Sequence, residues 1–181
     1  MMPKRMRPGF AIWLTGLPSS GKTTLAHALR DLLAERDISV QVLDSDELRI
    51  RLTPNPQYSP EERDWFYDIV TFLTELLVKN GVNVLIAATA TRRAYRERAR
   101  NRIDRFAEVD VDCPPEVCQE RDRKGLWKQA RQGEIAAFPG IGTPYEPPES
   151  PDVHVDTVRL SKDDAVQHIL AQLDARGFFS P

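Results

Sequence analysis

The sequence predicts an α/β fold with a mostly parallel five-stranded sheet, helices on both faces, and a lid. Three observations predict it. Short apolar runs alternate with segments of helical periodicity along most of the chain, which is typical of parallel strands joined by helical crossovers. The run at residues 82–88 is too uniformly apolar for a surface strand and indicates a central one. A glycine-containing loop joins the first apolar run to the first helical segment.

The predicted strands are short apolar runs bounded by turn residues. They cover residues 10–14, 38–43, 82–88, 106–113 and 153–155. The predicted helices repeat apolar residues at three- and four-residue spacing or begin with cap signals. They cover residues 22–36, 59–80, 91–103, 114–120 and 162–176. Together these elements make three layers, with the sheet between two layers of helices.

Two of the helices carry explicit start signals. Ser59 is followed by a proline and then by Glu62, and Ser161 is followed by Asp164, so each serine is expected to cap its helix. The first of these helices carries its large apolar residues on one side: Trp65, Ile69, Phe72, Leu73, Leu76 and Leu77.

Composition limits the functional classes. Charged residues make up 29% of the chain and sum to a net charge of −2, so the overall field favours neither nucleic acid nor an anionic membrane as a partner. No apolar run approaches the roughly 20 residues that span a bilayer. Cys113 and Cys118 fit neither a disulfide framework nor a zinc knuckle, which favours the reducing cytoplasm. We expect a basic tail at residues 1–9, one domain at residues 10–181, and a lid at about residues 121–151, where glycines and prolines interrupt every pattern.

The loop after the first strand carries a nucleotide-binding motif. GLPSSGKT matches GxxxxGK[ST] at Gly16, Gly21, Lys22 and Thr23. Its glycines allow successive amides to point at a phosphate, the lysine bridges the β- and γ-phosphates, and the threonine hydroxyl binds Mg²⁺. The motif therefore predicts that ATP or GTP binds here with Mg²⁺. The predicted nucleotide-binding residues are Gly16, Leu17, Pro18, Ser19, Ser20, Gly21, Lys22, Thr23 and Thr24.

Of the proteins that use such a loop, a small-molecule kinase fits best. A GTPase needs [NT]KxD after a late strand, and the nearest string, SKDD at residues 161–164, lacks the first residue and is explained as a helix cap. A mechanical ATPase normally has acids at the end of an aliphatic strand, and the strand VLIAAT has none.

An acidic cluster follows the second predicted strand. In LDSDELR, residues 43–49, Asp44 and Asp46 emerge at the carboxyl edge of the sheet beside the phosphate loop. We expect the two aspartates to alternate along an extended chain. One of them can hold Mg²⁺ through a water molecule, and the other can accept the proton of the acceptor hydroxyl. Arg49 can bind an anionic group bidentately. The alternatives are a cap for Asp44 and a solvated surface position for Arg49.

At this point the sequence resembles the adenylylsulfate kinases, which phosphorylate the 3′-hydroxyl of adenosine 5′-phosphosulfate. The resemblance runs from Ile12 to about Leu173 and is densest at residues 120–151, which are similar to the lid of that family. LDSDELR resembles the family's DGDxxR, and YSPEER at residues 58–63 resembles its FSPxDR. The resemblance implies a P-loop kinase-like fold, ATP and Mg²⁺ as cofactors, and a homodimer.

The resemblance also implies site residues. Arg49 and Arg63 would hold the phosphosulfate of the acceptor, and Tyr58 and Phe138 would enclose its adenine. Lys22, Asp44 and Asp46 would carry the catalysis, with Thr23 and Asp44 at the magnesium. Arg121 would line the ATP base. The lid would contribute Lys124, together with Lys128 and Arg131.

Three departures from the family pattern concern the acceptor. The family's NIRR is replaced by FYDI at residues 66–69, which removes two cations and adds Asp68. Its SFISPYR is replaced by AATATRR at residues 87–93, so that Ala90 stands where a phosphoserine could form. Ser45 replaces the middle glycine of DGD and is expected to crowd the turn. Arg92 and Arg93 are candidates for restoring the lost positive charge.

These departures leave other functions open. The acceptor can be a different nucleotide or sugar hydroxyl, for example a cytidine diphosphoramidate-type metabolite. The chain can also be a catalytically degenerate nucleotide-binding module, although it keeps both acids and the lid. The arginine-rich helix at residues 91–102 suggests a nucleic-acid-binding surface, but an expected Arg93–Glu97 pair and the acidic balance favour a solvated helix face.

Overall fold

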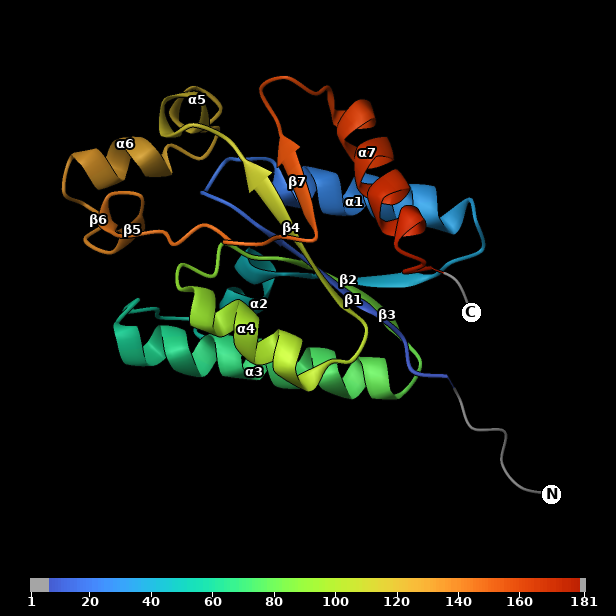
Figure 1. The fold of residues 1–181 in the computed structure, drawn as a ribbon. Helices are drawn as coiled ribbons and strands as arrows, with labels where there is room; N and C mark the ends of the chain where they lie inside the picture. The colour runs from blue at the N-terminus through green and yellow to red at the C-terminus, as the bar shows by residue number, and fades with distance from the viewer. Residues whose placement is uncertain (1–6, 180–181) are drawn as a thin grey trace.

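A computed structural model describes residues 7–179 of the chain, and residues 1–6 and 180–181 lie outside the described part. Its centre is a five-stranded sheet (Figure 1). The strands are β1 (Ala11–Thr15), β2 (Val40–Asp44), β3 (Asn83–Ala87), β4 (Phe106–Asp112) and β7 (Val153–Asp156). They lie in the order β2-β3-β1-β4-β7, and every neighbouring pair is parallel. The predicted mostly parallel sheet is therefore confirmed.

Five helices lie where the sequence predicts them. They are α1 (Lys22–Ala34), α3 (Pro60–Lys79), α4 (Arg93–Arg102), α5 (Pro115–Glu120) and α7 (Lys162–Ala175). Both predicted serine caps are present: the hydroxyl of Ser59 accepts from the amide of Glu62 at 3.2 Å, and that of Ser161 accepts from the amide of Asp164 at 3.2 Å. Each bond satisfies one of the amides that a helix start leaves without an intrahelical partner.

Two further helices were not predicted. Helix α2 (Ser45–Leu52) begins immediately after β2, with Asp44 as its N-cap. Helix α6 (Leu126–Arg131) lies inside the predicted lid and begins after Gly125, whose φ of 70° is left-handed. Both helices are short, so neither shows a clear apolar period in the sequence.

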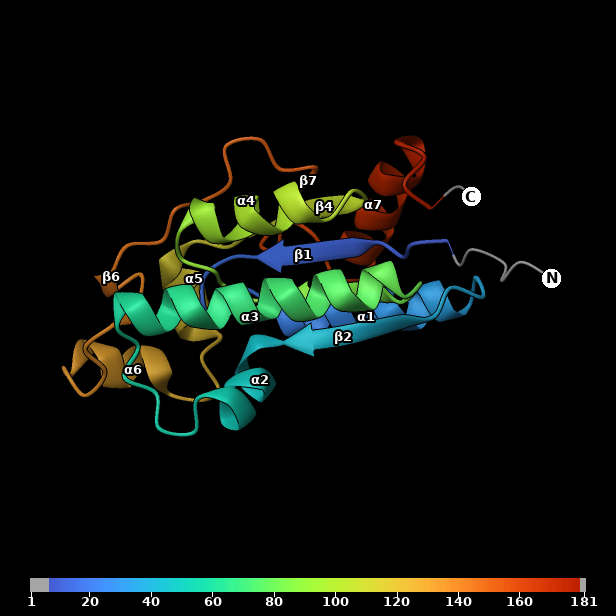
Figure 2. The same ribbon diagram turned by 90° about the horizontal axis from the view of Figure 1, so that it is seen from below.

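The helices cover the two faces of the sheet in pairs. On one face, Leu29 of α1 and Ile169 of α7 pack with Ile12 and Leu14 of β1. On the other face, α3 and α4 cover the alternate strand residues, such as Trp13 (Figure 2). Strand side chains point alternately to the two faces, so this arrangement gives the predicted three layers.

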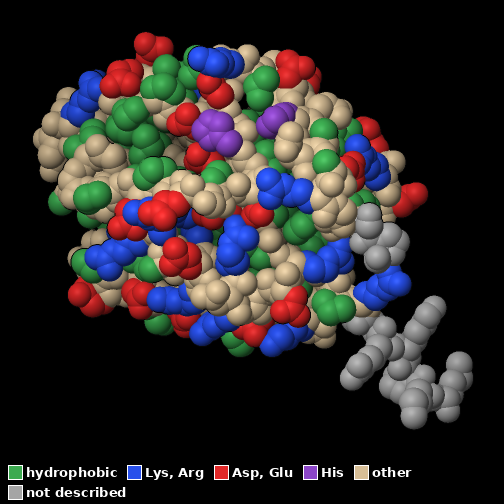
Figure 3. Space-filling model, in the orientation of Figure 1, with side chains coloured by type: hydrophobic (Ala, Val, Ile, Leu, Met, Phe, Trp, Pro, Cys, Tyr) green, Lys and Arg blue, Asp and Glu red, His purple; other side chains and the backbone are tan. Residues whose placement is uncertain are grey.

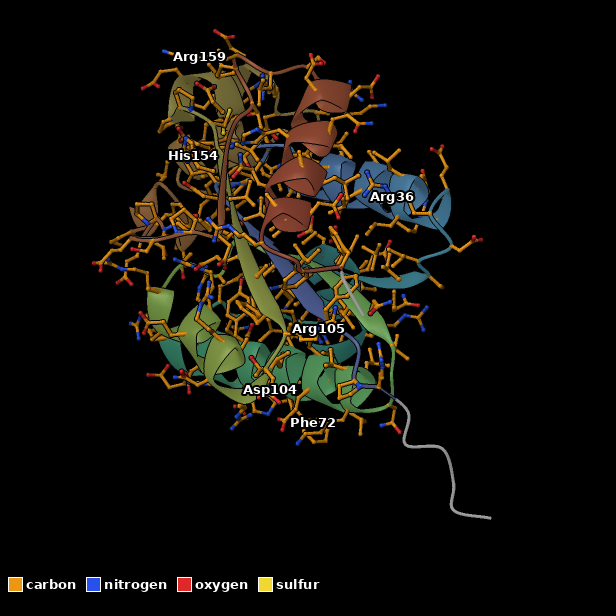
Figure 4. All side chains as sticks on the ribbon, turned by 45° about the vertical axis from the view of Figure 1, so that its right-hand side comes forward. Arg36, Phe72, Asp104, Arg105, His154 and Arg159 are labelled. Carbon is orange, nitrogen blue, oxygen red and sulfur yellow. The ribbon has the colours of Figure 1, made fainter. Side chains whose placement is uncertain are left out.

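Helix α3 differs from the sequence pattern. Its packed side is made by Phe66, Tyr67, Val70 and Val78. Its large apolar residues point partly outward, since Trp65, Phe72 and Leu76 are 49%, 51% and 49% exposed. Phe72 lies on the side of α3 away from the sheet (Figure 4). Helix α3 therefore has two apolar sides, and residues 7–179 cover only one of them.

The arginines of α4 are mostly neutralised by acids from other elements. The expected Arg93–Glu97 pair is not formed, because Arg93 pairs with Glu146 and Glu149 instead. Arg98 pairs with Asp64 and Asp68 of α3. Basic and acidic side chains are intermixed on the face shown in Figure 3. On this face the basic side chains of α4 are therefore interrupted by acids, whereas a nucleic-acid backbone binds to a continuous basic patch.

The predicted lid packs into a small separate core. Trp127 of α6 packs edge-to-face on Phe138 of β5 (Phe138–Pro139), with ring centroids 5.0 Å apart. Ala130 and two cysteines from the preceding segment, Cys113 and Cys118, complete this cluster, and a second two-residue strand, β6 (Gly142–Thr143), pairs with β5. The indole of Trp127 donates to the carbonyl of Pro18 at 3.1 Å. The lid therefore rests directly on the loop after β1.

The two ends of the described chain lie side by side. The ring of Phe10 packs against Phe178 and Phe179, with centroids 5.3 and 5.4 Å apart. Gly9 is buried and donates its amide to Val78 at 2.8 Å, so it is not part of a free tail. Most of the predicted tail, residues 1–6, lies outside the described residues. These ends lie on the opposite side of the molecule from α6 and β5 (Figure 1).

Candidate active site

One large cavity lies at the carboxyl edge of the sheet, where parallel α/β folds bind their ligands. Its volume is about 1190 Å³. The loop after β1 forms one end, the start of α2 and residues before α3 form the other, and the lid borders both. A cavity of this size and position can hold two nucleotides at once.

The loop after β1 has the backbone that phosphate binding requires. Gly21 has a left-handed φ of 108°, and Ser19 has a φ of 67°. A side chain at Gly16 would meet the carbonyl oxygen of Val111 at 2.4 Å, so only glycine fits there. Helix α1 follows directly and adds the positive end of its dipole.

Lys22 is held inside this loop. Its ammonium donates to the carbonyl of Gly16 at 3.0 Å and to that of Leu17 at 2.8 Å. Burial lowers the pKa of Lys22 to about 8, although Asp46 and Asp44 oppose the shift. A buried ammonium with only carbonyl partners is a strong point of attraction for phosphate oxygens.

Thr23 and Asp44 form a pair of oxygens beside the loop. The hydroxyl of Thr23 donates to Oδ2 of Asp44 at 2.6 Å, while Oδ1 of Asp44 accepts from the amide of Asp46 at 2.8 Å. A hydroxyl next to a carboxylate is the oxygen-rich donor set that Mg²⁺ prefers. Asp44 is also the N-cap of α2, so the cap and the predicted magnesium position are compatible roles of one side chain.

Asp46 lies in the first turn of α2, not in extended chain. The expected alternation of Asp44 and Asp46 along a strand is therefore wrong. The expected crowding at Ser45 is wrong too, because this residue begins a helix, where a side chain is no obstacle. The carboxylate of Asp46 pairs with Lys124 of the lid at 2.7 Å, and this contact raises the pKa of Lys124. Both side chains are exposed to the cavity opening.

Arg49 is fixed at the far end of the cavity. Its guanidinium lies 3.9 Å from the centroid of the Phe66 ring and 5.0 Å from that of Tyr58. Nη1 pairs with Glu62 at 3.2 Å, and Nη2 is buried without a hydrogen-bond partner among the described residues. Arg49 is therefore not a solvated surface residue, and its free donor is suited to an anionic ligand.

Arg63 links α3 to the lid beside Arg49. Its Nε donates to the carbonyl of Tyr58 at 3.0 Å, and Nη2 donates to the carbonyl of Ala137. Tyr58 has a left-handed φ of 55°, a costly conformation for a non-glycine residue that is typical of ligand sites. Tyr58 and Phe138 both line the cavity, so two aromatic rings and two guanidinium groups share this end.

Arg121 lies at the donor end. Its guanidinium donates to Oγ1 of Thr157 at 3.0 Å and to the carbonyl of Thr157 at 2.7 Å. The loop from Thr157 to Lys162, between β7 and α7, lines the cavity next to it. Two features missed in the sequence are this loop and Arg123. The carboxyl-edge rule could have indicated the loop, because it follows a parallel strand as the acidic cluster does.

Nearly all the predicted site residues line this cavity. Gly16 and Leu17 do not: Gly16 lies against β4, and Leu17 packs into the small core of the lid. Lys128 and Arg131 lie in α6 but do not line the cavity.

Comparison with known proteins supports one family. The family model described as adenylylsulphate kinase matches residues 8–156. The adenylyl-sulfate kinase of Gloeothece citriformis is 44% identical over 170 residues, which cover 94% of this chain and 97% of the relative. The APS kinase of Mycobacterium tuberculosis in complex with AMPPNP and APS is 35% identical, with a TM-score of 0.86, and the match covers 92% of this chain and 98% of that one.

The chain belongs to the adenylylsulphate kinase family. A longer relative, the hexameric APS kinase of Thiobacillus denitrificans, is 30% identical with a TM-score of 0.71, and the match covers 98% of this chain and 31% of that one.

The departures from the adenylylsulphate kinase pattern have different effects in the structure. Phe66, at the position of the family's asparagine, lies under Arg49. Asp68, which the sequence places among the changes that concern the acceptor, pairs instead with Arg98 and Arg102 on the side of α3 that faces α4. Tyr67 accepts from the amide of Ala90 at 3.0 Å, where φ is 45°. Its hydroxyl thus holds the strained loop after β3.

Proposed function

We propose that this protein transfers the γ-phosphoryl group of ATP to the 3′-hydroxyl of adenylylsulfate. The observation that carries the proposal is a single cavity with a phosphate loop at one end and the Arg49, Arg63, Tyr58 and Phe138 cluster at the other. The acids Asp44 and Asp46 lie between the two ends. The family and the relatives named above support this reaction.

ATP would bind with its phosphates in the loop from Gly16 to Thr24. Lys22 would contact the β- and γ-phosphates, and Arg121 would lie along the base. Thr23 and Asp44 would hold Mg²⁺, Asp44 through a water molecule, and the ion would neutralise charge on the phosphates.

The acceptor would bind at the other end. A purine ring fits between the aromatic rings of Tyr58 and Phe138, and two guanidinium groups match an anionic phosphosulfate. Asp46 would accept the proton of the acceptor hydroxyl as the phosphoryl group arrives. Lys124 would have to leave Asp46 at that point, or share it with the acceptor, because the ion pair occupies one oxygen of the carboxylate.

We also propose a homodimer in the cytoplasm. The outer side of α3 offers Trp65, Phe72 and Leu76 to a second copy, and an exposed apolar face of this kind is typical of an oligomer interface. The two cysteines are free thiols, which fits a reducing compartment. Among residues 7–179, no helix combines the length and apolarity of a membrane span.

The test is release of ADP by purified protein with Mg·ATP and a panel of acceptors. Adenylylsulfate should stimulate release well above the rate with ATP alone, and adenosine monophosphate should not. Arg49→Lys is a useful variant, because it keeps the charge but loses bidentate binding, and it should raise the KM of adenylylsulfate more than that of ATP. Tight ATP binding with no stimulation by any acceptor would support a degenerate module instead.

A second acceptor class is supported by one observation. Phe66 presents a ring to Arg49 where the family has an amide, and Ala90 and Thr91 replace a serine and a proline in the loop after β3. A different anionic nucleotide would then bind at this end and present a sugar hydroxyl to ATP. The same panel distinguishes the two, because the true acceptor should give the highest kcat/KM.

A further inference from the structure

A second cavity lies behind Arg63, and none of the roles proposed above is assigned to it. Its volume is about 290 Å³, many times the roughly 30 Å³ that one water takes up in the liquid. Its lining comes from the first turns of α3 and α4 and from the lid, and Figure 2 shows how these segments approach one another in the fold. Tyr58, Arg63 and Ala137 line both cavities, so these residues form the wall between them.

A buried hydroxyl without a partner lines this second cavity. Tyr95 of α4 is 2% exposed, and its ring stacks on Tyr67 with centroids 4.8 Å apart. Its Oη atom has no hydrogen-bond partner among the described residues. Burial raises the pKa of Tyr95, so the group remains a neutral donor. Buried hydroxyl groups are nearly always paired, so this one indicates a bound molecule or ion.

The cavity also contains positive charge. Arg92 lines it and makes no ion pair with any residue from 7 to 179; the charge of Arg92 acts only at longer range on Glu61 at the start of α3, where it contributes to lowering the pKa of that carboxyl. The next five arginines all have acidic partners: Arg93, Arg96, Arg98, Arg100 and Arg102. Arg63 contributes a second guanidinium, fixed by its bonds to the carbonyls of Tyr58 and Ala137.

One acid lines the same space. Glu146 accepts from the amide of Arg93 at 2.8 Å and lies 3.9 Å from the Nε of that residue. Arg93 also pairs with Glu149, so the charge of Glu146 is only partly neutralised, and the lining sets two guanidinium charges against one carboxylate. The remaining polar groups of the lining are the hydroxyls of Thr91 and Thr143. Two guanidinium groups and one neutral hydroxyl donor form a set that matches an oxyanion better than a cation or an apolar group.

We propose that this cavity binds a tetrahedral oxyanion, sulfate or phosphate, next to the acceptor position. The oxyanion has two possible sources. It can be the outer end of the acceptor nucleotide reaching past Arg63, in which case the inference rests on the proposed function. It can also be free inorganic sulfate or phosphate, in which case the cavity acts independently of the reaction.

The test uses Tyr95→Phe and Arg92→Gln, with Arg102→Gln as the matched control on the same helix. Tyr95→Phe keeps the stacked ring and removes only the unpaired hydroxyl, and Arg92 is exposed, so both variants should fold like the wild type. Thermal unfolding of all four proteins checks this. The KM of adenylylsulfate, the inhibition constant of adenosine monophosphate, and calorimetric binding of sodium sulfate to the Mg·ADP-loaded proteins are then measured.

If the acceptor supplies the oxyanion, the KM of adenylylsulfate should rise about tenfold in both variants, the size expected for one lost hydrogen bond to a charged group. The inhibition constant of adenosine monophosphate, which lacks the sulfate, should stay the same. If the oxyanion is free, sulfate binding should weaken about tenfold in both variants at unchanged KM. Arg102→Gln should match the wild type throughout.

The proposal is overturned if the KM and the sulfate affinity of both variants stay within about twofold of the control, well below the loss expected for one charged hydrogen bond. The cavity then holds water only. Failure of the proposed function gives a different result: the wild type shows no release of ADP with adenylylsulfate, and the sulfate titration alone decides whether the cavity binds an oxyanion.

Discussion

The buried ammonium of Lys22 predicts a specific dependence on pH. Burial lowers its pKa from 10.5 to about 8, a difference of about 2.5 units. Each unit corresponds to about 1.36 kcal/mol, so the charged form costs the folded protein about 3 kcal/mol. Below pH 8 Lys22 is charged in both the folded and the unfolded protein, and the whole penalty is present. Between pH 8 and 10.5 only the unfolded chain keeps the proton, so the penalty disappears as pH rises.

This penalty can be measured against Lys22→Met. The free energy of unfolding is determined with urea for both proteins from pH 7 to 10.5. The difference between them should change by about 3 kcal/mol in favour of the wild type, with most of the change above pH 8. Burial raises the pKa values of Cys118 and Tyr145 to about 12, so these groups do not titrate in the folded protein in that range. In the unfolded chain they titrate equally in both proteins, so their contribution cancels in the difference.

The same group should control the capture of ATP. The kcat/KM for ATP reports the free enzyme, and it should fall about tenfold per pH unit above pH 8 as Lys22 loses its proton. Bound phosphates favour the charged form, so kcat should fall only at higher pH. A kcat/KM that stays level to pH 9.5, together with a constant stability difference from Lys22→Met, would show that burial does not perturb this lysine.

Three other changes have defined outcomes. Asp46→Asn removes a proton acceptor, so in steady-state kinetics it should lower kcat about 100-fold or more while the KM of ATP stays within about threefold of the wild-type value. Normal turnover of this variant would mean that Asp46 serves only as the ion-pair partner of Lys124. Phe66→Leu should raise the KM of the acceptor several-fold by removing about 1 to 2 kcal/mol of cation–π attraction from Arg49, and an equal rise in the KM of ATP would point to general loosening. Glu108→Gln leaves the guanidinium of Arg96 buried without its carboxylate and should cost about 3 kcal/mol in urea unfolding; a loss below 1 kcal/mol would mean that carbonyl partners alone hold Arg96.

The sequence predicts well those parts of the fold that depend on local signals. The strands, the serine caps and the phosphate loop are specified by residues within a few positions of one another, and the structure places them within two residues of expectation. Helix α2 was missed because Asp44 marks both the end of a strand and the start of a helix. Nothing in the spacing of LDSDELR separates these two possibilities.

The remaining errors concern long-range pairing. Asp68 belongs to a family motif that concerns the acceptor, yet Arg98, 30 positions later in the chain, binds it on another side of α3. Phe72 points outward because the opposite side of α3 packs on the sheet. Both sides of this helix are apolar, so the sequence does not show which of them is buried. The second cavity exists because the lid passes beside α4 and forms part of its lining. These outcomes are set by tertiary packing, which a helical period alone does not encode.

The contact between Phe10 and the pair Phe178 and Phe179 has a practical consequence for engineering. Because the two ends meet far from the catalytic edge, a short linker between them should permit circular permutation, with new termini opened elsewhere on the surface. For the same reason, a partner domain fused at either end can be accommodated without obstructing the entry of nucleotides.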